Sequence, residues 1–384
     1  MGKKQIKEMI LGVWDRIEQA NAISVEKKKY KDPRRVQRVE SVSLTKEQLK
    51  RIDDLYSKNY GKKISVQWHK SYTSYTGTFD EKYVPETLYI PRFERYMNYD
   101  SNLANVLENK NLLYVFANAA GVVMPKRYLA CQEGFYSTGD GRPVTIDEAA
   151  ELLMNIGDCF AKPSIGTDSG RGCEVFCFKN GKDVNTGISC KEALVSMGKN
   201  FTIQERVICH ESVRRIYSGS VNTFRIMTYR WHDDIIVAPI IMRIGRGGSY
   251  LDNAHAGGMF IALSNDGTLH KRAFTELEDS YEVHPDSNLK FEGYKIELLP
   301  EVVETVVRMH KTLPTVGVIN WDMTINEAGT PILIEANVNG GGIWIFQMAH
   351  GKGVFEERTE EILRWIGKMD HLKYAIRKKH HFGD

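Results

Sequence analysis

The sequence predicts an α+β protein in which a helical, aromatic-rich N-terminal region precedes a strand-rich part. Three observations predict it. Apolar residues recur at helical spacing in the first 55 residues, short strands and helices alternate after about residue 100, and 42% of the 384 residues are apolar. A chain of this length forms about two to three domains or lobes.

The composition excludes several classes of protein. The net charge is +3, from 52 basic and 49 acidic residues, which is too balanced to indicate nucleic-acid binding. No apolar run approaches the ~18 residues of a membrane helix, and the first residues carry no uninterrupted hydrophobic stretch, so we expect neither a transmembrane segment nor a signal peptide. We expect a cytoplasmic protein. Its six cysteines form no Cys-x-x-Cys pair, which predicts reduced, mostly buried thiols.

Basic residues crowd two segments of the chain, residues 27–38 and 377–379. Charge blocks of this kind are typical of a solvated surface. The alternative is peripheral contact with an anionic partner, such as a membrane surface or a polyanionic substrate.

The N-terminal region is predicted to contain at least two helices. Four apolar residues recur at three- and four-residue steps, as in an amphipathic helix: Ile6, Ile10, Val13 and Ile17. Thr45 and Gln48 fit a capping box, so a second helix is expected to begin there. Residues 56–100 are rich in Trp, Tyr and Phe, and we expect an irregular segment packed on a larger unit rather than a stacking platform.

After residue 100 the pattern favours short, alternating elements. Thr145 with Glu148, and Ser189 before residue 190, indicate helix starts. Glu327-Ala328-Gly329 indicates the turn of a hairpin. The predicted helices cover residues 109–120, 147–154, 190–197, 300–313 and 355–366. The predicted strands cover residues 159–163, 173–179, 201–209, several segments of 223–263, 317–326 and 331–338.

A glycine-bearing loop joins the two apolar runs that end at Lys162 and begin at Cys173. Gly166, Gly170 and Gly172 allow the backbone to approach a ligand, and exposed N–H groups with a nearby lysine suit a phosphate. A hairpin tip that binds no ligand fits the same residues. The loop is not a P-loop, because no Gly-Lys-Ser/Thr opens a helix here.

A second group of polar residues lies in the predicted hairpin. Glu335 and Asn337 are two residues apart, so they point to one face of a strand, and Asp322 is nearly opposite on the partner strand. A carboxylate among apolar residues costs free energy unless it is paired or bound to metal. Two carboxylates and an amide oxygen suit Mg²⁺ that bridges phosphates. The alternative is a hairpin whose polar face is merely hydrated.

The two groups together have a characteristic order: lysine, glycine-rich loop, a strand with Gln204-Glu205, an arginine-bearing strand, then Asp and Glu-x-Asn. This order resembles the ATP-grasp superfamily over about residues 109–353. Within it, the chain is most similar to the sugar-transfer-associated ATP-grasp proteins. The segments that carry this closer resemblance are residues 82–98, 204–210, 222–228, 252–258 and 320–322.

The resemblance implies a two-lobed ATP-grasp fold behind the helical N-terminal region. It divides the chain into an N-terminal region (residues 1–100), a small lobe with the flap (101–205), a metal-binding lobe (206–355) and a C-terminal helix with a basic tail (356–384). The implied cofactors are ATP and Mg²⁺.

The resemblance also assigns the nucleotide contacts. Lys110 and Lys162 match the two phosphate-binding lysines. Residues 164–172 match the mobile flap, whose candidate contacts are Ser164, Gly166, Ser169, Gly170 and Gly172. The hinge that holds adenine matches Gln204, Glu205 and Val207. Glu211 has the spacing of the ribose contact, with His210 as the competitor. Asp322, Glu335 and Asn337 match the magnesium ligands.

Arg225 and Arg243 are the candidate catalytic residues. They lie on predicted strands that face the nucleotide, so we expect them to contact the transferring phosphoryl group or the acceptor carboxylate. Arg246, in the following glycine loop, is a weaker candidate. The alternative for all three is a salt bridge.

The resemblance implies an ATP-dependent carboxylate–amine ligase that acts through an acyl phosphate. Its expected substrates are small-molecule carboxylates and amines, such as a sugar acid or an amino acid, in surface-polysaccharide metabolism. A kinase of the same fold that phosphorylates a hydroxyl uses the same ATP site and is the first alternative. A nucleotide-gated binding or assembly protein without turnover is the second, and the complete set of metal ligands argues against it.

Overall fold

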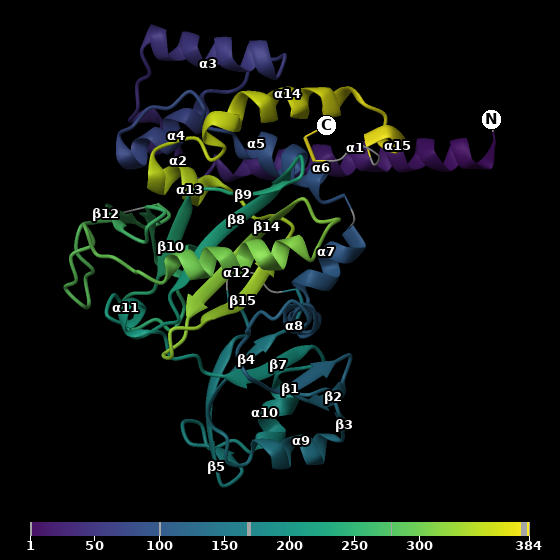
Figure 1. Ribbon diagram of the computed structural model, residues 1–384, viewed down its shortest axis with the longest axis vertical. Coiled ribbons are helices and arrows are strands. Elements are labelled where there is room, and N and C mark those ends of the chain that lie inside the picture. The colour runs from purple at the N-terminus through teal and green to yellow at the C-terminus, as the bar shows by residue number, and fades with distance from the viewer. Residues whose placement is uncertain (1, 100, 167–169, 278, 378–381, 384) are drawn as a thin grey trace.

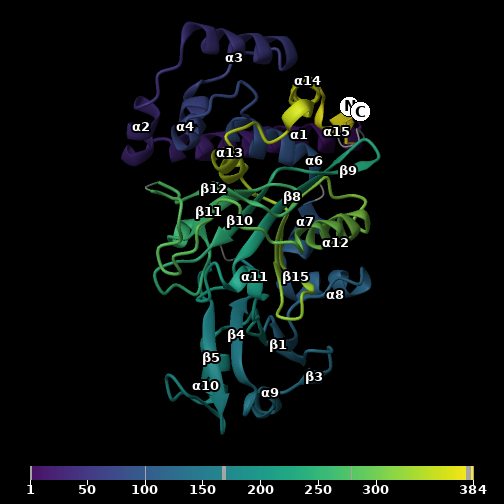
Figure 2. The same ribbon diagram turned by 60° about the vertical axis from the view of Figure 1, so that its left-hand side comes forward.

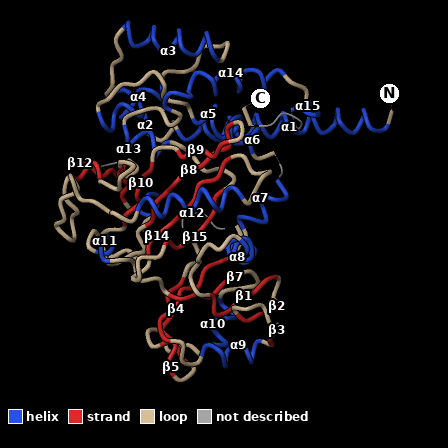
Figure 3. Tube along the Cα trace, in the orientation of Figure 1, coloured by secondary structure: helices blue, strands red, loops and turns tan. Residues whose placement is uncertain are grey.

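The computed structural model describes residues 2–99, 101–166, 170–277, 279–377 and 382–383. A helical layer lies at one end, a large sheet in the middle and a small lobe at the other end (Figure 1). The tube in Figure 3 shows the same division, with helices at the end that carries both termini and strands below them. None of the helices in these ranges is long and apolar enough to cross a membrane.

The helical layer joins the two ends of the sequence. Its N-terminal members are α1 (Lys3–Lys29), α2 (Pro33–Glu40), α3 (Lys46–Asn59), α4 (Gln67–Thr76), α5 (Glu86–Leu88), a π-helix (Tyr89–Glu94) and α6 (Arg95–Met97). Its C-terminal members are α13 (Trp344–His350), a 3₁₀ turn (Glu356–Arg358), α14 (Thr359–His371) and α15 (Tyr374–Arg377). Both groups share one hydrophobic core with one face of the large sheet.

The aromatic segment is more regular than the sequence predicts. Much of residues 56–100 is helical, and its rings are buried in the core that the helical layer shares with the sheet, Tyr72, Tyr83 and Phe93 at 0% exposure. The expectation that these rings pack is therefore confirmed, whereas the expectation of an irregular segment is wrong. Packing on the sheet supplies the stabilisation that short helices lack in isolation.

The large sheet has the strand order β13-β12-β11-β10-β8-β14-β15, and β9 pairs with β8. One face contacts the helical layer, and the other is covered by α7 (Ser101–Glu108), α8 (Lys110–Ala119), α11 (Glu211–Arg214) and α12 (Leu299–Lys311). Because both faces are buried, β11 is apolar at every position. Its strands are β8 (Thr223–Trp231), β9 (Asp234–Val237), β10 (Ile240–Ile244), β11 (Met259–Leu263), β12 (Leu269–Phe274), β13 (Ser280–Tyr281), β14 (Val318–Ile325) and β15 (Pro331–Asn337). A 3₁₀ turn, Ala254–Ala256, precedes β11.

The small lobe is a second sheet with its own core, in the order β3-β2-β1-β7-β4-β5-β6. Helices α9 (Ile146–Leu153) and α10 (Cys190–Ser196) pack on it, and both begin with the predicted capping residues, Thr145 and Ser189. Its strands are β1 (Arg127–Gln132), β2 (Phe135–Thr138), β3 (Pro143–Val144), β4 (Gly157–Pro163), β5 (Glu174–Lys179), β6 (Lys182–Asp183) and β7 (Phe201–Glu205).

The predicted hairpin forms as β14 and β15, joined through Asn326–Thr330. Asp322 pairs with Glu335 and Asn320 with Asn337, so the candidate metal ligands are side by side. All six cysteines are unpaired thiols, four of them buried, as the sequence predicts.

Candidate active site

A cleft of about 1300 Å³ separates the small lobe from the large sheet. In Figure 2 the small lobe lies below the large sheet, and its strands β4 and β5 run toward that sheet. Eleven residues predicted from the sequence line this cleft: Lys110, Lys162, Gly170, Gln204, Glu205, Val207, Arg225, Arg243, Asp322, Glu335 and Asn337.

Asp322 lies at the centre of an arginine cluster. Arg225 is its register partner on β8, and the Arg225 Nε and Nη2 atoms donate to the two carboxylate oxygens at 2.5 and 3.0 Å. Arg243 Nη2 lies 3.1 Å from Oδ2. Burial raises the pKa of this carboxyl, but the two guanidinium groups outweigh burial and hold the pKa below its usual value. Asp322 is therefore a buried anion, 1% exposed, balanced by two cations.

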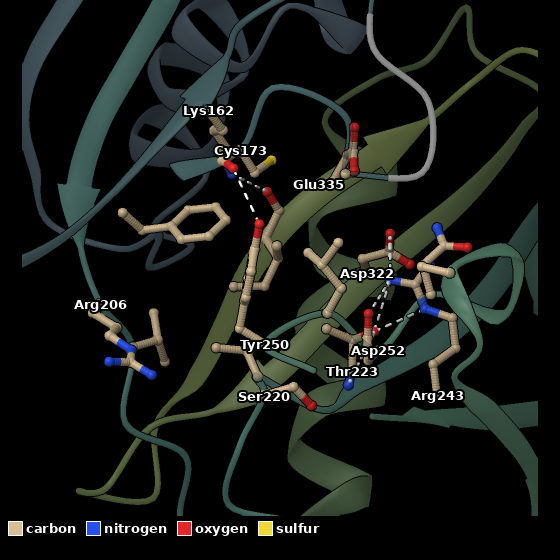
Figure 4. Close-up of a pocket in the computed structure, with 18 of the residues that line it drawn as sticks. Lys162, Cys173, Arg206, Ser220, Thr223, Arg243, Tyr250, Asp252, Asp322 and Glu335 are labelled. Atoms are coloured by element: carbon tan, nitrogen blue, oxygen red, sulfur yellow. Dashed lines mark hydrogen bonds and ion pairs between the residues drawn. The ribbon is translucent and has the colours of Figure 1, made fainter. Parts of the chain in front are cut away.

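Asp252 completes this cluster from the loop before β11. It accepts hydrogen bonds from the backbone N–H and the hydroxyl of Thr223, at 3.0 and 2.5 Å, and lies 3.5 Å from Arg243 Nη2. Burial raises the pKa of Asp252, against the pull of Arg243. Figure 4 shows Asp252, Thr223 and Arg243 grouped beside Asp322. Arg243 is thus held by two carboxylates and a hydroxyl, which fixes the direction of its fork.

The two predicted lysines approach the hairpin from different elements, Lys162 from β4 of the small lobe and Lys110 from the start of α8. Lys110 Nζ is 2.9 Å from Glu335 Oε1, and Lys162 Nζ donates to the Ile334 carbonyl at 3.3 Å. Burial, reinforced by the charge of Lys110, lowers the pKa of Lys162 to about 8. The Lys162 contact joins the two sides of the cleft, because Lys162 lies near the end of β4 whereas Ile334 belongs to β15.

The glycine-rich loop rests against residues 250–251 of the other lobe. A Cβ at Gly170 would meet Leu251 Cδ1 at 2.7 Å, and the Tyr250 hydroxyl donates to the Cys173 carbonyl at 3.3 Å, as Figure 4 shows. Gly166, Gly170 and Gly172 all have positive φ. Ser164 is fully buried at the base of the loop and accepts from Lys110 N, whereas Ser169 lies outside the described residues.

The hinge and ribose candidates separate in space. Gln204, Glu205 and Val207 line the cleft. The Glu205 side chain accepts a hydrogen bond from the backbone N–H of Lys126 at 2.8 Å, which holds the end of β7 against the segment before β1. Glu211 is exposed and forms an ion pair with Arg214 at 2.8 Å. Arg214 lines the cleft, whereas Glu211 does not. His210 caps α11 through Ser212 N. The ribose contact stays a prediction.

Four backbone N–H groups after β15 are held by carboxylates from the N-terminal half. Glu108 accepts from Val338 and Asn339 N, at 3.2 and 2.7 Å, and Glu94 accepts from residues 340 and 341, at 2.7 and 3.0 Å. Asn339 and residue 340 line the cleft. The sequence shows no local signal for these two glutamates, because the loop that they hold is more than 200 residues away.

The candidate metal ligands fit magnesium by their chemistry. Among the described residues no group of three His, Cys, Asp or Glu is placed to hold a metal, so the amide of Asn337 is needed beside the two carboxylates. Asn337 Nδ2 lies 3.4 Å from Asp322 Oδ2. Glu335 and Asp322 pair with Lys110 and the arginines, so a bound Mg²⁺ would share these carboxylates with them.

Similar solved structures include known ligases and synthases, at low similarity. A carboxyaminoimidazole ribonucleotide synthase from Aspergillus clavatus, complexed with ATP, is 12% identical over 61% of this chain and 45% of its own, with a TM-score of 0.36. An L-amino acid ligase from Bacillus licheniformis is 15% identical over 68% and 48%, with a TM-score of 0.36. The D-alanyl-alanine synthetase A of Vibrio cholerae is 12% identical over 69% and 64%, with a TM-score of 0.40. This chain therefore spans less than two thirds of each.

No curated protein matches the sequence. The sugar-transfer associated ATP-grasp family, in contrast, matches residues 90–363, which include both lobes and every lining residue named above. That range is well over half of the chain. The protein therefore belongs to the sugar-transfer associated ATP-grasp family.

Proposed function

We propose that the protein is an ATP-dependent carboxylate–amine ligase of the cytoplasm that acts through an acyl phosphate. The observation that carries the proposal is the convergence, in one cleft, of two lysines, two arginines and the Asp322–Glu335–Asn337 set. Phosphoryl transfer depends on positioning and charge neutralisation, and these residues supply cations on both sides of the cleft.

The proposed reaction has two steps. An oxygen of the substrate carboxylate attacks the γ-phosphorus of ATP, and ADP leaves as the acyl phosphate forms. The amine nitrogen then attacks the acyl carbon, the carbon–oxygen bond to phosphate breaks, and the nitrogen loses a proton as the amide forms. Activation is required because an oxide ion cannot leave a free carboxylate.

Each charged group of the cleft has a role in this scheme. Lys110 and Lys162 bind the anionic oxygens of the β- and γ-phosphates. Arg225 and Arg243 hold the acceptor carboxylate or the transferring phosphoryl group, and Asp322 orients both guanidinium groups through the contacts at 2.5–3.1 Å. Magnesium, when bound by Asp322, Glu335 and Asn337, supplies further positive charge to the phosphates.

Family membership supports a substrate from sugar or surface-polysaccharide chemistry, such as a sugar acid or an amino acid. The two arginines suit an anionic ligand, because guanidinium groups favour carboxylate and phosphate oxygens. These oxygens can belong to the acceptor carboxylate or to the transferring phosphoryl group, so product analysis separates the ligase from the kinase.

The test is product analysis with ATP, Mg²⁺ and a panel of carboxylates and amines. ADP with an amide supports the ligase, and hydroxylamine in place of the amine should trap the acyl phosphate as a hydroxamate. Lys162→Ala should slow the trapping on the order of a hundredfold. ADP with a stable phosphoester would establish the kinase instead, and binding of ATP without ADP formation would establish a binding protein.

A further inference from the structure

Helix α1 has its polar side turned toward the protein. Asp15 is 8% exposed and pairs with Arg95 at 2.9 Å and with Arg377. Gln19 donates to the Pro91 carbonyl at 3.0 Å and to the Tyr96 hydroxyl at 2.7 Å. Glu26 lies two turns further along the same side of the helix and is 3% exposed. The helix is therefore fixed to the helical layer through hydrogen bonds and ion pairs.

The opposite side of α1 is apolar and faces outward. Six large side chains, each between 41% and 61% exposed, follow the spacing i, i+3, i+4, i+7, i+8 and i+11: Ile6, Met9, Ile10, Val13, Trp14 and Ile17. We call these six residues the α1 stripe. At 3.6 residues per turn they form one continuous band along the helix.

In Figures 1 and 3 the N-terminal end of α1 projects past α15, away from both sheets. The stripe begins on this projecting end and continues to the part of the helix where Asp15 pairs with Arg95 and Arg377. Amphipathic helices on a protein surface normally turn their apolar side inward, whereas α1 does the reverse. A contiguous exposed apolar surface of this kind marks a site of interaction with a protein or a membrane.

Charge identifies the partner. Helix α1 carries seven basic residues (Lys3, Lys4, Lys7, Arg16, Lys27, Lys28 and Lys29) and four acidic ones (Glu8, Asp15, Glu18 and Glu26), a difference of three. Two of the acids, Asp15 and Glu26, are buried and ion-paired on the inner side. Glu26 forms its ion pair with Lys29 of the same helix. The other exposed charged residues of the helix are thus six cations against two anions, Glu8 and Glu18.

The cations also lie where an anionic surface would meet them. By helical periodicity, Lys7 flanks the stripe beside Trp14, Arg16 flanks it on the other side beside Met9, and Lys3 lies in line with the stripe at its N-terminal end. Trp14 lies within the stripe, and tryptophan favours the boundary between acyl chains and headgroups. An apolar band between flanking cations, with an aromatic residue, is the pattern of a helix that lies in the plane of a membrane interface.

We propose that the α1 stripe docks on an anionic lipid surface, with α1 parallel to the membrane plane. The proposal is independent of the reaction in the cleft. It places the contact on the apolar side of α1 rather than on the basic segment 27–38, where Arg35 binds Glu276 within the protein.

Flotation of the full chain with vesicles tests the proposal. The vesicles contain phosphatidylcholine alone or phosphatidylcholine with phosphatidylglycerol at a ratio of 3:1. We expect at least tenfold more protein on the anionic vesicles, a tenfold loss for Ile10→Ser/Val13→Ser, and a smaller loss for Lys3→Gln/Lys7→Gln. The matched control is Val115→Ser/Val195→Ser, which removes two valines that are 59% and 64% exposed on α8 and α10. This control should float like the original protein.

Several outcomes would overturn the proposal. Failure to float with anionic vesicles would do so, as would equal flotation of the stripe variant and its control. Equal binding to both kinds of vesicle would remove the charge argument. A dimer that the stripe variant converts to a monomer, without lipid binding, would assign the stripe to a second copy of the chain. Thermal denaturation of each variant checks that these exposed substitutions leave the fold intact.

Discussion

Arg225 and Asp322 are register partners on adjacent antiparallel strands, and their side chains form a two-point ion pair at 2.5 and 3.0 Å. The pair is nearly buried, with Asp322 at 1% exposure. A side-on arginine–carboxylate contact fixes the plane of the guanidinium group as well as its position. The sheet itself therefore aims one of the two candidate catalytic arginines.

Asp322→Asn should lower both stability and turnover. The change leaves Arg225 and Arg243 buried with one counter-charge fewer, which costs roughly 3–5 kcal/mol of unfolding free energy for a buried pair. Urea denaturation measures the stability, and ADP release measures turnover. Unchanged stability would show that solvent already compensates the two arginines.

Glu335→Gln should abolish magnesium-dependent turnover while the fold stays intact. Glu335 is 29% exposed at its side chain and its partner Lys110 is 9% exposed, but the glutamine amide oxygen can still accept a hydrogen bond from that lysine. We expect turnover to fall at least a hundredfold and the unfolding free energy to change by less than about 1 kcal/mol. Full activity of this variant would remove Glu335 from the metal site.

Gly170→Ala should weaken ATP binding about tenfold, because the new methyl group would prevent the flap from closing against Leu251. The new Cβ would meet Leu251 Cδ1 at 2.7 Å, and the residue has φ +77°. Gly187→Ala is the matched control, because it has φ +76° with no atom within 4 Å of the new Cβ. Hydrogen exchange with and without ADP and Mg²⁺ should show nucleotide-dependent protection of the flap in the control only. Equal behaviour of the two variants would show that backbone conformation, not the Leu251 contact, matters.

Lys162 should give the reaction a basic pH limit. Its pKa is lowered to about 8, chiefly by burial. The ammonium group is charged below that pH and neutral above it, so kcat/KM for ATP should fall as pH rises through about 8. Lys162→Arg stays charged, so its profile should lack this decline. A decline that persists in the arginine variant would assign the titration to another group.

Glu86→Gln should stabilise the protein at neutral and alkaline pH. Burial raises the pKa of Glu86 to about 8, above its unfolded value, so the folded state retains a proton that the unfolded state releases. The contribution of Glu86 to the free energy of unfolding is therefore greatest below about pH 4.5 and declines toward pH 8. The glutamine does not titrate, and its advantage should grow over that range to roughly 1–3 kcal/mol.

The exposed Glu327→Gln is the control for this comparison, and melting temperatures from pH 5 to 8 give the readout. An equal pH dependence in both variants and the original protein would contradict the assignment to Glu86.

Local signals in the sequence predict much of the fold. The capping boxes of α3, α9 and α10 involve side chains three residues apart, so sequence spacing alone specifies them. The β14–β15 hairpin and its facing polar residues follow from one turn and the two-residue period of strands. Family motifs predict that Lys110, Lys162 and Glu335 serve the nucleotide, and all three line the cleft.

Contacts between distant segments could not be predicted. Asp252 becomes the partner of Arg243 only because the loop before β11 folds back over β10. Glu94 and Glu108 have no sequence pattern that links them to residues 338–341. Periodicity predicts the apolar stripe of α1, but it does not say that the stripe faces outward, since that depends on which side binds the helical layer.

The core of the helical layer has a consequence for how the chain is made. Its members come from residues 30–97 and 343–369, together with strands of the large sheet. A ribosome that adds 5–20 residues per second needs roughly 12–50 s to synthesise the approximately 250 residues between those two groups. Throughout that interval the newly synthesised aromatic segment lacks helices α13 and α14, which complete its hydrophobic core. The aromatic segment, although made before both sheets, is therefore among the last parts of this chain to be fully sheltered from water.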